Sequence, residues 1–323
     1  MYGFYTDIGG RGNNEDSLLA IESGGAYLFA VADGLGGHEA GEVASRILVD
    51  KLRRAFMKTP YSFDLEQSVK RANALILSEQ DRTGKKMKTT VSAAYVFGGR
   101  TYVANVGDSR VYLFDEGNIV FTSVDHSVAQ MAVHAGEITA DKIRSHPDRN
   151  ILTRALGSAA GIKVDMYTVD NSTYDRLLIC SDGFWEHVLE SQMTETARAN
   201  ASPDAWIGAM RRFRDADAPD GGDNNTAVAM VKSALETHRT VKRAPDPAAD
   251  NAASPDAASG KSSGRPPFLT GLLIALICLG LIAIAASAAY LAGFRGFGMN
   301  NAQPADPTGA LPALARIFLF LAF

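Results

Sequence analysis

Short apolar runs rich in Val, Ile, Tyr and Phe recur along the first two thirds of the chain, and this pattern predicts β-strands. The turn signals Gly-Gly-Arg at 98–100 and Asp-Glu-Gly-Asn at 115–118 separate neighbouring runs and indicate antiparallel hairpins. The expected strands are 2–8, 26–32, 90–97, 100–106, 110–115, 118–122, 163–169, 175–181 and 226–232. The pattern therefore predicts a β-rich domain with antiparallel pairing.

Two further segments repeat apolar residues at intervals of three and four, which is typical of amphipathic helices. They cover residues 39–58 and 64–80. Each apolar stripe is expected to pack on a sheet as part of the core. Strands and helices together predict one α+β domain over residues 1–232.

After residue 232 the composition changes twice. Residues 233–266 are rich in Ala, Pro, Ser, Gly and Asp, which is typical of a flexible linker. Residues 267–294 carry no charge and exceed the about 20 apolar residues that cross a bilayer as a helix. Lys and Arg are more frequent before this segment than after it, which predicts a single-pass inner-membrane protein with residues 1–232 in the cytoplasm. The tail 295–323 ends in an apolar run too short to span and is expected at the interface.

The overall composition narrows the class of protein only modestly. With 46% hydrophobic and 21% charged residues the chain is ordinary for a globular protein, and a net charge of −4 argues against a nucleic-acid partner. Cys180 and Cys278 are too few and too dissimilar in setting for a disulfide framework, which fits a reducing compartment. The first residues lack the basic and apolar regions of a signal peptide, so none is expected.

Three of the predicted strands run directly into an Asp-Gly or Gly-Asp pair. One such dipeptide is typical of a turn. Here the apolar runs before Asp33, Asp182 and Asp108 all deliver a carboxylate at one end. A carboxylate at the mouth of a core is costly unless something neutralises it, so the repeated pattern indicates a shared cation site.

Other acidic residues also lie at strand ends and turns. The full set is Asp7, Glu15, Asp16, Asp33, Asp108, Asp182 and Asp223. No Cys/His pair has zinc spacing, and oxygen ligands alone select hard cations such as Mg²⁺ or Mn²⁺. Gly34 would let its carbonyl approach an ion without a side chain in the way. Because several carboxylates around one point repel each other, two ions are expected, and such a pair activates water and clamps a phosphoryl group.

The substrate side of such a site needs a positive charge. Arg11 stands near Glu15 and Asp16, and a guanidinium binds phosphate oxygens in a bidentate manner, although an Arg beside acids is more often a surface salt bridge. Other phosphate chemistries fit badly, because Glu186 stands where a Cys-x5-Arg phosphatase starting at Cys180 needs Arg. The chain also lacks the Gly-Lys-Ser/Thr end of a phosphate-binding loop and the kinase motif set. A metal-bound water is therefore expected to attack.

Residues 1–232 resemble the bacterial metal-dependent protein phosphatases of the protein phosphatase 2C type. The motifs that carry the resemblance, in the family's order, are RGNNEDS, AVADGLGGHEAGE, VANVGDSRVYL, VDHSVAQ, GEIT…HPDRNILTRALG, CSDGFWE and GGDNNTAV. The resemblance implies a four-layer αββα sandwich of two antiparallel β-sheets flanked by helices. It also implies hydrolysis of phosphoserine and phosphothreonine on proteins, and it does not extend beyond residue 232.

The resemblance further implies which residues hold the two Mn²⁺ or Mg²⁺ ions. Asp33 is expected to bridge both ions. Gly34 is expected to offer its carbonyl to one of them. Asp182 and Asp223 are expected to complete the coordination shell of the other.

The remaining roles also follow from the resemblance. Glu15 and Asp16 are expected to hold metal-bound waters. Asp108 is expected to help bind a third, weaker ion, and Arg11 to hold the phosphate. Residues 123–160, which are called the flap below, are expected to lie beside the site.

The sequence departs from the family's pattern in two places. Some members have a His directly after the Asp-Gly as general acid, and Leu35 stands here instead. His38 is left as either a proton donor or a turn residue. Lys88 replaces a frequent Gly before the Thr-Thr pair, so the approach of the substrate is expected to differ locally. His126 and His134 in the flap are interpreted as packing or surface residues.

These observations predict a membrane-tethered phosphatase that acts on phosphorylated protein substrates and opposes a cognate bacterial Ser/Thr kinase. Two alternatives remain open. One is a non-catalytic adaptor that binds phosphoproteins at the membrane. The other is a phosphatase of small molecules that uses the same metal site.

Overall fold

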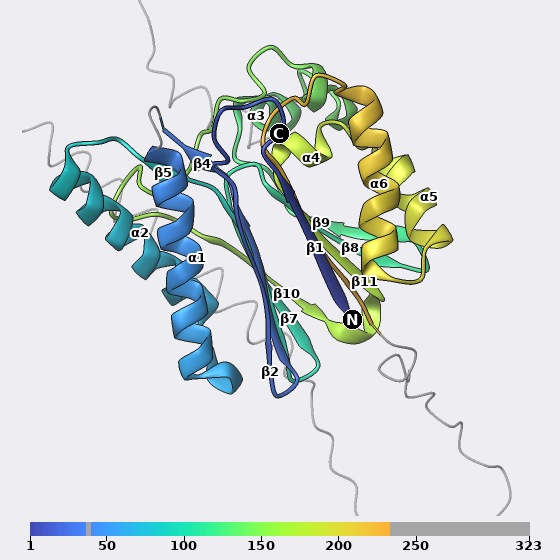
Figure 1. Cartoon of the computed structure of the whole chain (residues 1–323), viewed down its shortest axis with the longest axis horizontal. Coiled ribbons are helices and arrows are strands. Elements are labelled where there is room, and N and C mark those ends of the chain that lie inside the picture. Colours follow the sequence, from blue (N-terminus) through green and yellow to red (C-terminus); the bar gives the residue numbers. More distant parts are fainter. Residues whose placement is uncertain (37–39, 233–323) are drawn as a thin grey trace, which may run out of the picture. The chain divides into compact units, whose positions relative to one another are not determined.

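The computed structural model describes residues 1–36 and 40–232, and these form two antiparallel β-sheets with helices on both outer faces (Figure 1). The α+β prediction is therefore confirmed. The linker, transmembrane segment and tail predicted after residue 232 lie outside the described residues, as does His38. Within 1–36 and 40–232, no helix combines the length and apolar character needed to cross a membrane.

The first sheet has the strand order β1-β12-β11-β8-β9. Its strands are β1 Tyr2–Asp7, β12 Asn225–Val231, β11 Arg176–Cys180, β8 Arg110–Asp115 and β9 Asn118–Thr122. The pairing of β1 with β12 joins the two ends of the domain, with Tyr2 opposite Met230 and Asp7 opposite Asn225. This register brings the loop after Asp7 next to the loop before Asn225.

The second sheet has the strand order β10-β7-β6-β3-β2. Its strands are β10 Asp165–Asp170, β7 Arg100–Val106, β6 Val91–Phe97, β3 Ala26–Ala32 and β2 Ser17–Ser23. A separate two-residue pair, β4 Gly34–Leu35 with β5 Lys88–Thr89, continues from the ends of β3 and β6. This small pair shapes the chain directly after Asp33.

Helices cover the outer face of each sheet (Figure 1). The long helices are α1 Ala40–Lys58 and α2 Leu65–Thr83 over the second sheet, and α5 Glu190–Ala199 and α6 Pro203–Asp217 over the first. Shorter elements are α3 Val128–His134, α4 Asp182–Trp185, η1 Pro60–Ser62, η2 Ala140–Ser145 and η3 Asn171–Thr173.

Three buried apolar layers hold this arrangement together. Leu48 and Phe56 of α1 belong to the layer beneath α1 and α2. Phe29 and Ile179 lie between the two sheets, and Trp206 of α6 belongs to the third layer. Because β3 is buried on both faces, its sequence is continuously apolar and does not alternate. Three cores between four layers are the sandwich that the family resemblance implied.

The strands expected from the sequence are all present, and their ends agree with the expected bounds to within two residues. The sequence reading missed β2, because Leu18 and Leu19 are adjacent and break the alternation expected of a half-exposed strand. It also missed α5 and α6. For α6 a signal existed, since Ser202 caps the helix by accepting a hydrogen bond from the Ala205 amide and Pro203 opens its first turn.

Candidate metal centre

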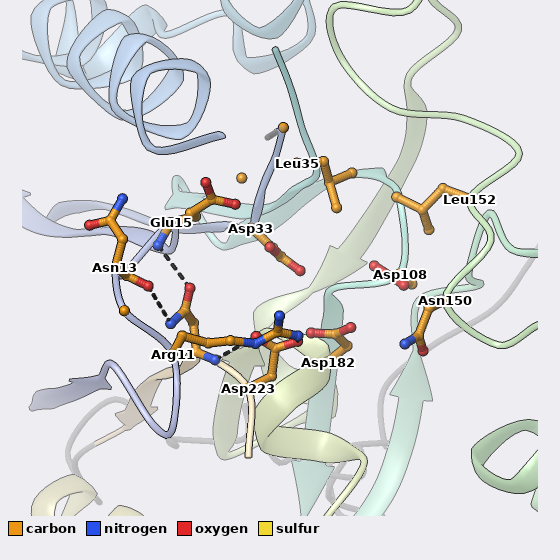
Figure 2. A pocket seen from close by; sticks show the side chains of 14 residues that line it. Arg11, Asn13, Glu15, Asp33, Leu35, Asp108, Asn150, Leu152, Asp182 and Asp223 are labelled. Atoms are coloured by element: carbon orange, nitrogen blue, oxygen red, sulfur yellow. Dashed lines mark hydrogen bonds and ion pairs between the residues drawn. The ribbon is translucent and has the colours of Figure 1, made fainter. Parts of the chain in front are cut away.

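A polar cavity of about 630 Å³ opens at the end of the sandwich where β3, β7 and β11 finish (Figure 2). Seven of the eight site residues expected from the sequence line it: Arg11, Glu15, Asp33, Gly34, Asp108, Asp182 and Asp223. The eighth, Asp16, is buried behind the cavity wall. The structure thus brings together groups that are separated by up to 212 residues along the chain.

Asp33, Asp108 and Asp182 form the centre of the cavity. Each offers a carboxylate oxygen, and these oxygens all lie within 4.8 Å of one another. Asp33 follows β3 of one sheet, Asp182 follows β11 of the other, and Asp108 lies in the turn between β7 and β8. Two sheets that meet at their strand ends therefore produce a cluster that neither sheet contains alone.

The three carboxylates are electrostatically unfavourable without a cation. Burial, followed by the charge of Asp182, raises the pKa of Asp33 well above its usual range. Burial and Asp182 likewise raise the pKa of Asp108. For Asp182, burial and the nearby Glu186 and Asp223 raise the pKa to about 7. A divalent cation would remove this penalty by supplying opposite charge at the point where these groups meet.

The donor set fits such an ion. Only oxygen ligands face the centre, which suits Mg²⁺ or Mn²⁺ and not zinc. The oxygen Asp108 Oδ1 is buried and has no hydrogen-bond partner anywhere in the described part of the chain. A buried, unpaired carboxylate oxygen is a rare arrangement that an ion explains directly.

Thr89 and Thr90, to which the sequence analysis assigned no role, hold Asp33 in place. Thr90 Oγ1 accepts a hydrogen bond from the Asp33 amide at 2.9 Å, and the Thr90 amide donates to the Asp33 carbonyl at 2.8 Å. The Thr89 hydroxyl also donates to that carbonyl at 2.9 Å. The backbone of Asp33 is therefore fully bonded, which leaves its carboxylate free to face the cavity.

The packing of the backbone around Gly34 also requires a glycine at this position. A Cβ added at this position would overlap the carbonyl oxygen of Gly41 in α1 and would lie 2.6 Å from the carbonyl oxygen of Glu15. The Gly34 amide also donates to that Glu15 carbonyl at 3.1 Å. Three backbone segments converge here, so only a glycine fits between them.

Asn224 fixes the loop that carries Glu15. Its side-chain oxygen accepts from the Glu15 amide at 2.8 Å, and its side-chain nitrogen donates to the carbonyls of Ile8 and Asn13 at 2.8 and 2.9 Å. Burial raises the pKa of Glu15, whose carboxylate faces the cavity. Asn224 was a missed functional residue, and its place directly after Asp223 was the available signal.

Asp16 lies behind the cavity wall and does not line the cavity. Its Oδ2 accepts a hydrogen bond from the Ser181 hydroxyl at 2.8 Å, and Ser181 directly precedes Asp182. Its Oδ1 is buried and finds no hydrogen-bond partner among residues 1–36 and 40–232. Burial raises the pKa of Asp16 to about 6. Asp16 is thus placed to orient the start of α4.

Arg11 stands at the rim of the cavity. Its Nη2 lies 2.6 Å from Asp223 Oδ2, while 60% of the Arg11 side chain stays exposed. Asp7 had been grouped with the acidic cluster, and this was wrong. Asp7 accepts from the Gly9 amide and pairs with Arg211 of α6, and it is not among the residues that line the cavity.

The departures from the family's pattern can also be placed. Leu35 lines the cavity, and the exposed Lys88 lies opposite it in the β4–β5 pair. His126 is buried and accepts a hydrogen bond from the Gly107 amide through Nδ1, and His134 is exposed on α3. The described flap contributes other cavity-lining residues that the sequence did not reveal, namely Asn150 and Leu152.

Comparison with known proteins identifies the family of this chain. The model of the family described as Protein phosphatase 2C matches residues 8–220. The serine/threonine phosphatase stp of Listeria welshimeri is 34% identical over 249 residues, covering 72% of this chain and 95% of that protein. The serine/threonine protein phosphatase PstP of Mycobacterium tuberculosis is 31% identical over 326 residues, covering 88% of this chain and 61% of that protein.

One similar solved structure contains bound metal ions. The crystal structure of the catalytic domain of PstP in complex with two manganese ions has a TM-score of 0.62 and 27% sequence identity, and covers 72% of this chain and 98% of that chain. Fold and site together define a metal-dependent serine/threonine protein phosphatase of the bacterial type. The chain belongs to the protein phosphatase 2C family, and its cofactors are Mn²⁺ or Mg²⁺.

Proposed function

We propose that this cavity hydrolyses phosphoserine and phosphothreonine on proteins with a water activated between two Mn²⁺ or Mg²⁺ ions. The observation that carries the proposal is the approach of Asp33, Asp108 and Asp182 to within 4.8 Å of one another. Arg11 stands at the rim of the same cavity. An oxygen cluster suits divalent cations, and an exposed guanidinium beside it suits a phosphoryl group.

Each lining residue has a distinct role in this proposal. Asp33 would serve both ions, the Gly34 carbonyl would bind one of them, and Asp182 and Asp223 would complete the ligands of the other. The bound ions supply a nucleophilic water at neutral pH and neutralise charge on the phosphoryl group. Glu15 faces the cavity, where it would hold a metal-bound water.

Two further acidic residues act beside these ligands. Asp16 acts from behind the wall by fixing Ser181, the residue before Asp182. Asp108 helps to hold a third and weaker ion, for which its unpaired Oδ1 is available. The site therefore combines residues that bind cations directly with Asp16, which orients the metal ligand Asp182.

Arg11 and Leu35 decide how the phosphoryl group enters and leaves. Because 60% of the Arg11 side chain is exposed, its guanidinium can turn from Asp223 to the phosphate oxygens of a substrate. Leu35 lines the cavity and offers no proton, so the proton for the leaving alkoxide would come from a cavity water or from His38. A Leu here also presents an apolar wall to the side chain of the substrate.

In the cell, we propose that residues 267–294 tether the enzyme to the inner membrane with the catalytic domain in the cytoplasm. The length and lack of charge of this segment, and the basic residues before it, support this arrangement. The substrates are then phosphoproteins made by a cognate Ser/Thr kinase. A tether raises the local concentration of the enzyme near membrane substrates.

The catalytic proposal is tested by phosphate release from a phosphothreonine peptide by the full chain in detergent, titrated with Mn²⁺ and with Mg²⁺. We expect saturable metal dependence that Asp33→Asn and Asp182→Asn abolish. A flat response with retained phosphopeptide binding would instead identify a non-catalytic adaptor. Faster turnover of a nucleotide than of the peptide would identify a small-molecule phosphatase.

The tether is tested separately by cell fractionation. We expect the full chain in the membrane fraction, resistant to high salt and released by detergent. A chain that ends at residue 232 is the matched control and is expected in the soluble fraction. A full chain recovered in the soluble fraction would contradict the tether and leave the catalytic proposal intact.

A further inference from the structure

The direction of the Asp108 carboxylate is set by its backbone. Asp108 Oδ1 is buried and accepts no hydrogen bond from any described residue. Asp108 is 5% exposed and lies in the turn that joins β7 to β8. Because Oδ1 has no partner to fix it, the carboxylate depends on the main chain of this turn for its direction, and whatever holds the turn also helps to aim the carboxylate.

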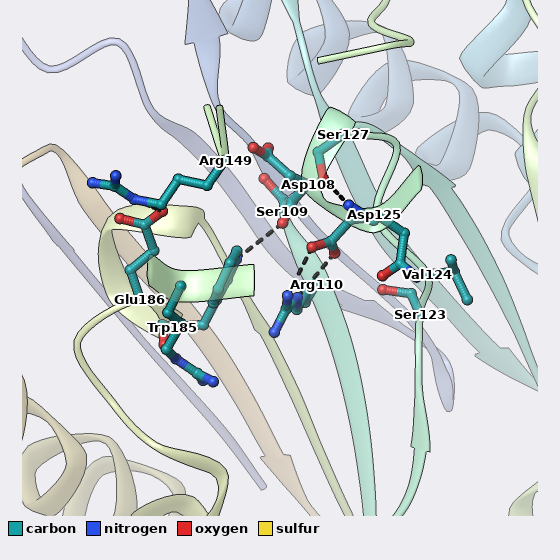
Figure 3. A network of polar contacts seen from close by, with 12 residues as sticks. Asp108, Ser109, Arg110, Ser123, Val124, Asp125, Ser127, Arg149, Trp185 and Glu186 are labelled. Carbon is teal, nitrogen blue, oxygen red and sulfur yellow. Dashed lines mark hydrogen bonds and ion pairs between the residues drawn. The ribbon is translucent and has the colours of Figure 1, made fainter. Parts of the chain in front are cut away.

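Trp185 holds this turn. Its indole Nε1–H donates to the Asp108 carbonyl at 2.9 Å, across 77 residues of sequence (Figure 3). Trp185 is the last residue of α4, the short helix that begins at Asp182. One rigid turn of helix therefore carries the Asp182 carboxylate at its start and the donor to Asp108 at its end.

The ring of Trp185 is itself clamped. The guanidinium carbon of Arg110 lies 3.4 Å from the centroid of the Trp185 ring. Arg110 in turn donates to both carboxylate oxygens of Asp125, at 2.9 and 2.7 Å, and this pair is almost fully buried (Figure 3). A bidentate ion pair stacked on an indole leaves the ring little freedom to rotate.

The flap also reaches Trp185. Arg144 donates to the Trp185 carbonyl through Nε at 3.2 Å and through Nη2 at 3.1 Å. Asp125 also belongs to the flap. Trp185 is therefore bonded to the cation site on its ring side and to the flap on its carbonyl side.

We propose that Trp185 is a positioning residue that aims Asp108 at the weakest of the bound cations. The proposal rests on the proposed function, since it takes Asp108 as a ligand of that ion. Groups that orient a ligand commonly change metal affinity about 10- to 100-fold when they are removed. The loss of the indole N–H should therefore weaken one ion selectively and spare the two held by Asp33 and Asp182.

The chain offers a matched control, because it contains only two tryptophans. Trp206 is fully buried like Trp185, but its Nε1 has no hydrogen-bond partner in the described part of the protein. Trp185→Phe removes ring volume and a hydrogen bond, whereas Trp206→Phe removes ring volume alone. Comparing the two variants separates positioning from packing.

The first experiment counts bound Mn²⁺ by electron paramagnetic resonance and calorimetry on the full chain in detergent, without substrate. We expect Trp185→Phe to weaken the weakest Mn²⁺ by about 10-fold or more and to change the tighter ions less than about twofold. Trp206→Phe should keep all affinities. Equal isotherms for the two variants would overturn the proposal. Absence of any Mn²⁺ binding by the wild type would overturn the proposed function itself.

A second measurement needs no variant. In an ¹⁵N-labelled wild-type chain titrated with Mg²⁺, the two indole N–H signals report on Trp185 and Trp206. We expect the Trp185 signal to shift with the last, weakest binding step and the Trp206 signal to stay in place. A Trp185 signal whose chemical shift does not change during this step would overturn the proposal, even if Trp185→Phe fails to fold.

Discussion

The Nη2 atom of Arg11 lies 2.6 Å from Asp223 Oδ2, although 212 residues separate the two in sequence. The contact depends on the pairing of β1 with β12, which places the two loops side by side. It also means that a proposed phosphate ligand and a proposed metal ligand neutralise each other before substrate and cation arrive. Binding of a phosphate by Arg11 would free Asp223 to bind a cation. Binding of a cation by Asp223 would likewise free Arg11 to bind a phosphate.

Arg11→Ala should therefore weaken substrate binding more than it weakens the fold. We expect KM for a phosphothreonine peptide to rise about 10-fold or more, as for the loss of a hydrogen bond to a charged group. Because the pair with Asp223 is largely exposed, the free energy of unfolding should fall by less than about 1 kcal/mol. The KM of Arg11→Lys should lie between the values of the wild type and Arg11→Ala, because an ammonium keeps the positive charge but lacks the bidentate fork. Steady-state kinetics and thermal melts measure both effects, and an unchanged KM for Arg11→Ala would contradict the role.

Asp182→Asn should remove activity and stabilise the metal-free protein at pH 7.5. The loss of one ligand is expected to lower kcat by about 100-fold or more, which is the scale of losing one electrostatic contact in an active site. The same change removes a buried charge whose pKa is raised to about 7 by burial and by Glu186 and Asp223. The melting temperature without metal should therefore rise, by ~2–4 °C for each kcal/mol gained. A lower melting temperature of the metal-free variant would show that Asp182 is not strained by its neighbours.

The metal-free protein should lose stability as the pH rises from about 4 to about 7. The carboxyl groups of Asp16 and Asp182 have pKa values raised to about 6 and about 7, mainly by burial. In this window the folded state holds protons that the unfolded chain has released, so the free energy of unfolding falls with increasing pH. Mn²⁺ should reverse the trend, because cations bind the deprotonated groups. Denaturant titrations at several pH values with and without Mn²⁺ test this, and parallel profiles would refute it.

Gly34→Ala should damage the fold at the site. Its Cβ would overlap the backbone of Gly41 and Glu15, and neither segment can move without displacing α1 or the loop of Glu15. Overpacking of this kind costs about 1–3 kcal/mol or more, with a matching loss of Mn²⁺ affinity. Gly12→Ala is the control, since Gly12 lines the same cavity and an added Cβ would meet no atom within 4 Å. Equal melting temperatures for the two variants would be inconsistent with the close approach at Gly34.

The sequence predicts those features of the fold that depend on local patterns of residues. Apolar runs mark β3 and β11, and a turn dipeptide at each end marks Asp33 and Asp182. The order of the motifs then predicts the family and half of the residues that line the cavity. The edge strand β2 was missed because its apolar residues do not alternate, and strand spacing alone does not reveal which helices cover the first sheet.

The sequence by itself determined which carboxylates could serve a divalent cation, because strand-ending aspartates are visible residue by residue. Only the tertiary structure decided how they are held: Thr90 on the backbone of Asp33, Ser181 between Asp16 and Asp182, and Trp185 on the carbonyl of Asp108. These contacts join residues that are 57 to 165 positions apart in the sequence. Hydrogen bonds between distant segments leave no periodic trace in a sequence, since they exist only after the two sheets have packed.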